Sequence, residues 1–112
     1  MLLIYTEPNQ PQPSSPAEAE AAMAPWISYS EALVSAGAMV GGDPLEGPHT
    51  ATTVRVRDGK RLVTDGPFAE TKEALMGYYM IDAPTLDEAL GWAEKVPAAP
   101  YGSIEVRPIM DM

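Results

Sequence analysis

Cysteine is missing altogether from this 112-residue sequence. Without it the chain can form no disulfide, no thiolate nucleophile and no cysteine-ligated metal site, which fits a protein of the reducing cytoplasm. Long apolar runs are missing too, since none approaches the roughly 18 residues of a membrane-spanning helix. The first residues, MLLIYTEP, lack the basic segment that begins a signal peptide. We therefore expect a cytoplasmic protein that makes no contact with a membrane.

Basic residues are scarce as well. The chain has 7 Lys and Arg against 16 Asp and Glu, which gives a formal net charge of −9. An acidic surface repels phosphate backbones, so we expect no nucleic-acid partner. Three of the arginines, Arg55, Arg57 and Arg61, fall within one predicted hairpin. There they either touch an anion or face solvent.

Hydrophobic residues make up 46% of the chain, as in an ordinary globular protein, and the length suits one domain spanning residues 1–112. Hydrophobic periodicity predicts the element order β-α-β-β-β-α-β. The expected strands cover residues 2–6, 51–57, 61–64, 75–82 and 103–109, and the expected helices cover 16–37 and 86–96. Residues 7–16 and 38–50, which are rich in Pro or Gly, are expected to be loops.

Local signals mark the ends of these elements. Capping-box spacing occurs twice, from Ser15 to Glu18 and from Thr85 to Glu88. Gly37 is suited to end the first helix, and Asp58-Gly59 is typical of a two-residue hairpin turn. Pro25 lies inside the first helix, where it either kinks the helix or marks its true beginning.

This order predicts an α+β fold, a ferredoxin-like split βαβ plan with an antiparallel sheet and one extra strand. Both helices are expected to cover the same face of the sheet, which leaves the other face partly apolar. An uncovered apolar face usually has a partner, and a homodimer that closes face to face is the simplest solution.

The connection 65-DGPFAETKE-73 is longer and richer in charge than the roughly two to five residues that join two strands. Asp65 either closes an Asx turn or acts as an acid or base whose pKa is raised by burial. Phe68 either fills an apolar gap or stacks on a ligand. Either Glu70, Lys72 and Glu73 form a local ion pair on a short helical turn, or Lys72 and Glu73 point into a pocket. In the pocket, Lys72 would meet an anionic group and Glu73 would accept a proton.

Other candidate residues lie outside this connection. Gly77 interrupts a strand, which indicates a bulge or the close approach of another backbone or a ligand. Tyr78 and Tyr79 face opposite sides of that strand, one in the core or at a dimer interface and the other with its hydroxyl available to a pocket. His49, the only histidine, is either a surface residue or part of a binding site.

Motifs for metal, nucleophile or phosphate chemistry are absent. Sequence spacing does not bring a set of metal ligands together, so we predict neither a metal nor another cofactor. No G-x-S-x-G motif occurs, and 41-GGDPLEG-47 lacks the Lys-Ser/Thr of a phosphate-binding loop.

The segment 65-DGPFAETKE-73, followed by 77-GYYMID-82, resembles the signature of the DGPF-type, YCII-related proteins. The resemblance continues through 2-LLIY-5, 41-GGDPL-45, 51-ATTVRVRDG-59, 87-DEAL-90 and 104-IEVRPIM-110. It implies a dimeric α/β barrel of ferredoxin-like halves with a pocket near the DGPF loop. For some members it also implies a link to extracytoplasmic-function sigma factors. In the wider superfamily it implies lyase-like and muconolactone-isomerase-type enzymes.

One departure from the family concerns a His-Asp dyad. The resemblance implies that enzymatic members pair a His on the first helix with an Asp, and this Asp maps onto Asp65. The first helix here contains no histidine, because the only one is His49 in a loop. The dyad is therefore incomplete.

Two hypotheses about function stay open. The first is a small-molecule-binding protein, lyase- or isomerase-like, with a pocket at the DGPF loop for an anionic ligand. Its predicted catalytic residues are Asp65 and Glu73, and its predicted substrate-binding residues are Phe68, Lys72, Gly77, Tyr78 and His49. The second is a non-enzymatic accessory or regulatory protein that acts through protein contacts, for example with a sigma factor.

Overall fold

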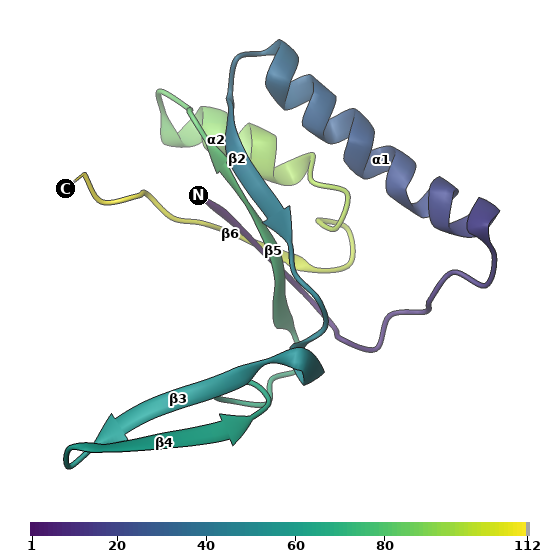
Figure 1. Ribbon diagram of the computed structural model, residues 1–112. Coiled ribbons are helices and arrows are strands. Elements are labelled where there is room, and N and C mark those ends of the chain that lie inside the picture. The colour runs from purple at the N-terminus through teal and green to yellow at the C-terminus, as the bar shows by residue number, and fades with distance from the viewer. Residues whose placement is uncertain (112) are drawn as a thin grey trace.

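A computed structural model describes residues 1–111 of the chain (Figure 1). Its elements are β1 Leu2–Thr6, α1 Pro16–Ser35, β2 Met39–Pro44, the short 3-10 helix η1 Pro48–Thr50, β3 Thr52–Arg57, β4 Lys60–Asp65, β5 Ala74–Ile81, α2 Leu86–Glu94 and β6 Ser103–Val106. Within the described residues, no helix is long and apolar enough to cross a membrane.

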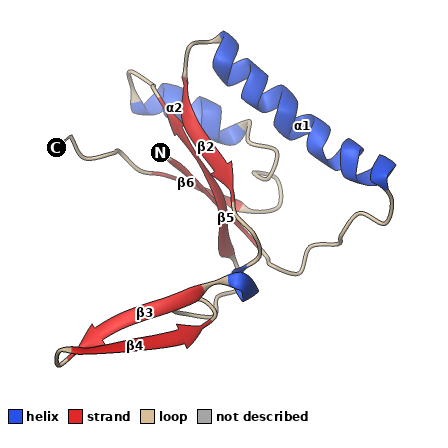
Figure 2. Cartoon of the chain, in the orientation of Figure 1, coloured by secondary structure: helices blue, strands red, loops and turns tan. Residues whose placement is uncertain are grey.

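Four strands form the main sheet in the order β2-β5-β1-β6, and neighbouring strands are all antiparallel. Strands β3 and β4 pair only with each other and form a separate two-stranded sheet, inserted between β2 and β5. Without this insertion the order is that of the ferredoxin-like plan. The predicted α+β class with an antiparallel sheet is confirmed (Figure 2).

Strand β2 corrects the prediction of a loop over residues 38–50. Met39–Pro44 contains two glycines and a proline, which lower the intrinsic preference for a strand. Its pairing with β5, from Met39 opposite Ile81 to Pro44 opposite Gly77, supplies the strand geometry. Proline and glycine are tolerated because β2 lies at the edge of the sheet.

Helix α1 runs unbroken through Pro25, so of the two alternatives for this residue, a kink or a restart, the restart is wrong. At its start, the Glu18 N–H donates to Ser15 Oγ at 3.1 Å, as the capping spacing predicts. At its end, Gly37 has a φ of +71°, and the Ala38 N–H donates to the Leu33 carbonyl at 2.9 Å. This left-handed glycine turn returns the chain toward the sheet and confirms Gly37 as the helix stop.

The hydrophobic core lies between one face of the sheet and both helices. Its buried residues are Leu2, Ile4, Tyr29, Leu33, Ala38, Ala93, Val96 and Ala98, with Trp26 and Trp92 partly buried against them. Leu2 and Ile4 alternate with Leu3 along β1, so Leu3 faces the opposite side of the sheet. That second face carries Tyr78 and Glu105, the cross-strand partners of Leu3.

The hairpin formed by β3 and β4 projects from the main sheet (Figure 2). Its turn places Asp58 at φ 52° and Gly59 at φ 73°, as a type I′ turn requires. The projection gives the chain a radius of gyration of 16.3 Å, against about 13 Å for a compact chain of this length. The hairpin therefore shares little of the core that stabilises the rest of the chain.

Gly77 lies beside an irregularity in the ladder between β1 and β5, where the register shifts between Ile4 and Tyr5. A Cβ at Gly77 would lie 3.1 Å from the carbonyl oxygen of Asp43. The bulge and the close backbone approach predicted for this glycine are both present.

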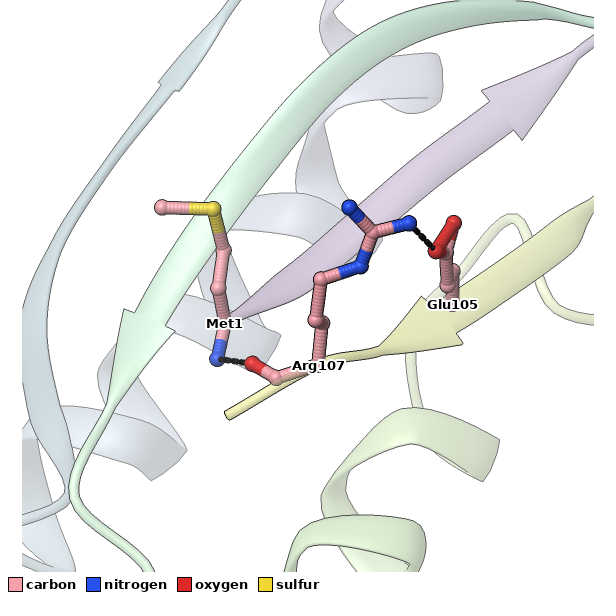
Figure 3. A network of polar contacts seen from close by, with 3 residues as sticks. All are labelled: Met1, Glu105 and Arg107. Atoms are coloured by element: carbon pink, nitrogen blue, oxygen red, sulfur yellow. Dashed lines mark hydrogen bonds and ion pairs between the residues drawn. The ribbon is translucent and has the colours of Figure 1, made fainter. Parts of the chain in front are cut away.

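Met1, just before β1, pairs with Arg107, just after the neighbouring strand β6 (Figure 3). The Met1 amino group donates to the Arg107 carbonyl at 2.7 Å, and the Arg107 N–H donates to the Met1 carbonyl at 3.0 Å. The Arg107 guanidinium also pairs with the Glu105 carboxylate. Strand β6 itself ends at Val106, earlier than predicted, because Pro108 lacks the N–H that a continuing ladder needs.

Tyr29 provides a prediction about alkaline stability. Burial, with a smaller contribution from Tyr79, raises the pKa of Tyr29 above its usual range, and its hydroxyl donates to the Trp92 carbonyl at 2.8 Å. Above about pH 10 an unfolded tyrosine loses its proton while the folded Tyr29 keeps it. We therefore expect the free energy of unfolding to be insensitive to this group below pH 10. It should then fall by up to about 1.4 kcal/mol per pH unit above pH 10.

Urea unfolding at pH 8 and pH 11, with Tyr29→Phe as the comparison, measures this effect. The variant lacks the hydrogen bond, so we expect it to be less stable by about 1 kcal/mol at pH 8 and to lose less stability at pH 11. Equal losses in both proteins at pH 11 would contradict the role of Tyr29.

Candidate functional site

A cavity lies between α1 and the β2–β5 side of the sheet. Its volume is about 800 Å³. Helix α1 contributes Met23, Trp26, Ile27 and Val34, and the sheet contributes Ile4, Met39, Met76 and Tyr79. We call this space the α1 cleft. Its lining is mainly apolar and aromatic.

The cleft exists because α1 touches the sheet along only one of its stripes. Tyr29 and Leu33, four residues apart, are buried against the sheet. Met23, Ile27 and Val34 recur at helical spacing on a neighbouring stripe and stay 53%, 54% and 63% exposed. These side chains line the cleft and are not covered by the sheet.

Ser30 and Tyr79 place a pair of hydroxyls in this apolar lining. Ser30 Oγ lies 3.0 Å from the Tyr79 hydroxyl, and either can be the donor. The Tyr79 ring also packs edge-on against Tyr29, with ring centroids 5.2 Å apart. Two hydroxyls that share one hydrogen bond keep one free proton and unused lone pairs. The pair can therefore both donate to and accept from a polar group in the cleft.

Asp43 and Tyr78 border the cleft at its β2–β5 edge. The Tyr78 hydroxyl donates to the Asp43 carboxylate at 2.7 Å, and this hydrogen bond raises the pKa of Tyr78. Asp43 is the cross-strand partner of Tyr78, so both side chains project from the face opposite Tyr79. Tyr79 is thus the core tyrosine, and the Tyr78 hydroxyl is engaged by Asp43.

Charge in the α1 cleft is sparse and of one sign. Glu31 and Asp43 are the charged residues among those that line it, and no Lys, Arg or His lines it within the part of the chain described. The cleft therefore has no cationic group to pair with an anion.

The DGPF loop borders a second depression, of about 540 Å³, on a different part of the molecule. Phe68 and Glu73 line it. Phe68 is 77% exposed, so of its two alternatives the filling of an apolar gap is wrong, because the loop lies beside the hairpin and outside the core. The Glu73 carboxylate accepts from Ser103 Oγ at 2.7 Å.

Asp65 lies at the end of β4, opposite Thr52, and is exposed. Within residues 1–111 its carboxylate accepts no hydrogen bond, so the Asx turn is not formed. An Asx turn would need the N–H two residues on, and Pro67 at that position has none, while the Gly66 N–H donates to the Ala51 carbonyl at 2.7 Å. The burial on which the acid or base hypothesis for Asp65 depended is also missing.

Neither Lys72 nor His49 is among the residues that line the two cavities. Lys72 is 87% exposed, and its Nζ is 3.7 Å from a Glu7 carboxylate oxygen, so its ion pair is not local to the loop as predicted. Residues 65–73 contain no helical turn that could hold such a local pair. His49 is an exposed residue of η1. Throughout residues 1–111 no three His, Asp or Glu side chains are grouped so that they could hold a metal ion.

The predicted site residues therefore divide between two places. Gly77 and Tyr78 border the α1 cleft, and Phe68 and Glu73 border the DGPF-loop depression, while Asp65, Lys72 and His49 border neither. Sequence reasoning missed the pairing of Ser30 with Tyr79. The available signal was Ser30, a hydroxyl at helical spacing among the apolar residues Met23, Trp26, Ile27 and Val34.

Comparison with known proteins agrees with the resemblance noted in the sequence. The sequence model of the YCII-related domain family matches residues 1–112 of the chain. The chain belongs to the YCII-related family. An uncharacterised protein of Rhizobium meliloti (strain 1021) is 38% identical over 110 residues, which cover 96% of this chain and 89% of that protein. The YCII-related membership predicted from the sequence is thus confirmed.

Proposed function

We propose that this YCII-related protein binds a small, neutral and mainly apolar molecule in the α1 cleft, and that it acts as a binding protein. The observation that carries the proposal is the cleft itself. Its volume of about 800 Å³ lies within the range of small-molecule sites, roughly 300–1,000 Å³. Such sites combine an apolar lining with a few placed polar groups, and the Ser30–Tyr79 pair supplies these groups.

Charge supports a neutral ligand. Two charged residues border the cleft, both carboxylates: Glu31, and Asp43, whose side chain projects from the opposite face of the sheet. The chain carries a net charge of −9. An anion that entered this space would lose hydration without gaining a counter-charge. The sequence predicted that Lys72 would bind an anionic ligand at the DGPF loop. That loop lies outside the α1 cleft, and its anionic ligand stays a prediction.

A binding role is better supported than lyase or isomerase chemistry. Acid–base catalysis needs its groups within hydrogen-bond reach of the same substrate. Of the residues predicted for such chemistry, Glu73 borders the DGPF-loop depression, whereas Asp65 and Lys72 do not. The α1 cleft itself offers hydroxyls that suit recognition. A catalytic role for the DGPF loop, association with a sigma factor and a cytoplasmic location stay predictions.

We further propose a homodimer that closes over the second face of the main sheet. Leu3, Tyr78 and Met80 project from this face, and the core and helices lie on the other. An apolar sheet face without a covering layer is usually buried in an assembly.

A neutral fluorescent probe, N-phenyl-1-naphthylamine, tests the cleft. We expect saturable binding by the native protein, weakened at least about tenfold by Ile27→Glu, because a carboxylate would enter the apolar lining. Leu90→Glu is the matched control: Leu90 is similarly exposed but lies on α2, outside the cleft, and should change affinity less than about twofold.

Displacement of the probe then tests the charge argument. Among decanol, decylamine and decanoate, we expect decanol to displace the probe and decanoate to be the weakest competitor. Non-saturable binding, or an equal loss in both variants, would overturn the binding proposal. Preferential displacement by decanoate would overturn the neutral-ligand assignment alone.

A further inference from the structure

The Ser30–Tyr79 hydroxyl pair lies between two apolar stretches of the α1 cleft. On the helix, Met23 and Ile27 precede Ser30, and Val34 follows it. With about 1.5 Å of rise per residue, Met23 lies about 10 Å before Ser30 along the helix axis and Val34 about 6 Å after it. This wall of the cleft therefore offers apolar contact on both sides of the two hydroxyls.

The sheet repeats this arrangement around Tyr79. Met76 comes before Tyr79 in β5, while Met39 of the neighbouring β2 pairs with Ile81, which comes after Tyr79. Met76 and Met39 both line the cleft. Both walls therefore place the hydroxyl pair between apolar side chains.

The Tyr79 ring is fixed by its neighbours. It packs edge-on against Tyr29, which is buried and whose own hydroxyl donates to the Trp92 carbonyl. On β2, Gly42 is the cross-strand partner of Tyr79, and a Cβ at Gly42 would lie 3.0 Å from Tyr79 Cδ1. The ring has little room to turn, so its hydroxyl is held in position before a ligand arrives. Such preorganisation lowers the entropic cost of binding.

The pair has one hydroxyl proton to give. Two hydroxyls carry two protons, and the hydrogen bond of 3.0 Å between Ser30 Oγ and the Tyr79 hydroxyl uses one of them, whichever group is the donor. A ligand that covers the pair takes water away from the remaining O–H, and a buried donor without a partner is costly. A carbonyl oxygen accepts this proton and brings none of its own. It is therefore the simplest neutral partner for the pair.

We propose that the α1 cleft selects molecules in which a carbonyl oxygen lies within an apolar skeleton, as in a ketone or an ester, and that the Ser30–Tyr79 pair donates to this oxygen. The inference rests on the binding function proposed above and names its ligand class. A carbonyl near the end of the skeleton would reach the pair only if one of the two apolar stretches stayed empty. The position of the oxygen along the skeleton therefore determines the affinity.

Two isomeric ketones, 5-undecanone and 2-undecanone, test the position of the oxygen by displacement of N-phenyl-1-naphthylamine. They contain the same atoms and nearly the same apolar surface, so a difference in affinity reports where the oxygen lies. We expect the native protein to bind 5-undecanone at least about fivefold more tightly, because 2-undecanone must give up either the hydrogen bond or part of the apolar contact.

Ser30→Ala/Tyr79→Phe removes both hydroxyls, which is necessary because either one alone keeps a proton for the ligand. Both partners of the hydrogen bond are lost together, so we expect the fold to be retained. This variant should bind the two ketones within about twofold of each other. The matched control, Ser28→Ala/Tyr5→Phe, removes the same two oxygen atoms from residues outside the cleft lining and should keep the preference of the native protein.

The carbonyl stretching frequency of bound 5-undecanone, isotope-labelled at the carbonyl carbon, tests the contact itself. We expect a lower frequency in the native protein than in Ser30→Ala/Tyr79→Phe, because a hydrogen bond weakens the C=O bond. Equal frequencies, or equal affinities of the two ketones for the native protein, would overturn the internal-carbonyl assignment and leave the binding of neutral molecules standing. A native protein that does not bind N-phenyl-1-naphthylamine saturably would overturn the proposed function as well.

Discussion

Gly102→Ala is expected to destabilise the protein by about 3 kcal/mol or more. This is the largest loss of stability that we predict for the addition of one methyl group. Gly102 lies in the turn before β6, and its N–H donates to the Ala98 carbonyl at 2.7 Å. A Cβ here would collide with the Tyr5 carbonyl oxygen and lie 2.9 Å from Thr6 Cγ2. The backbone cannot easily retreat, because Ser103, the next residue, is paired with Tyr5 in the sheet.

Gly91→Ala is the matched control for this prediction. Gly91 lies within α2, and a Cβ there would meet no atom within 4 Å. Alanine is the better helix former, so we expect this variant to gain about 0.5–1 kcal/mol. Urea unfolding of both variants measures the difference. Equal stability of Gly102→Ala and the native protein would show that the turn can relax, contrary to the collision argument.

Leu33→Ala should cost about 2–5 kcal/mol, the range for removal of a leucine from a close-packed core. Leu33 has 0% of its surface exposed, and its carbonyl accepts the hydrogen bond that closes the glycine turn after α1. The substitution removes the side chain that holds this end of the helix against the sheet. We therefore expect weaker binding of the neutral probe as well, because the α1 cleft is formed by that packing.

Val34→Ala, one residue along the helix, separates the two effects. Val34 is 63% exposed and lines the cleft, so its loss should cost less than about 1 kcal/mol in stability. It should still weaken probe binding, because apolar contact area is lost from the lining. A Leu33→Ala protein that unfolds at the same urea concentration as Val34→Ala would contradict the assignment of Leu33 as the anchor of α1.

The sequence by itself determined the features that depend on a few neighbouring residues. The caps at Ser15 and Thr85, the stop at Gly37 and the type I′ turn at Asp58-Gly59 are all present. Each of these is decided by local hydrogen bonds or by the φ that a residue type permits. The family membership was also readable, because it depends on the order of residues alone.

Only the tertiary structure decided the features that depend on packing between distant segments. Strand β2 is a strand because β5 pairs with it, in spite of its glycines and proline. Asp65, Lys72 and Glu73 are neighbours in sequence, but the loop that carries them directs each to different surroundings. The α1 cleft depends on which stripe of the helix meets the sheet, and periodicity alone does not choose between two adjacent apolar stripes.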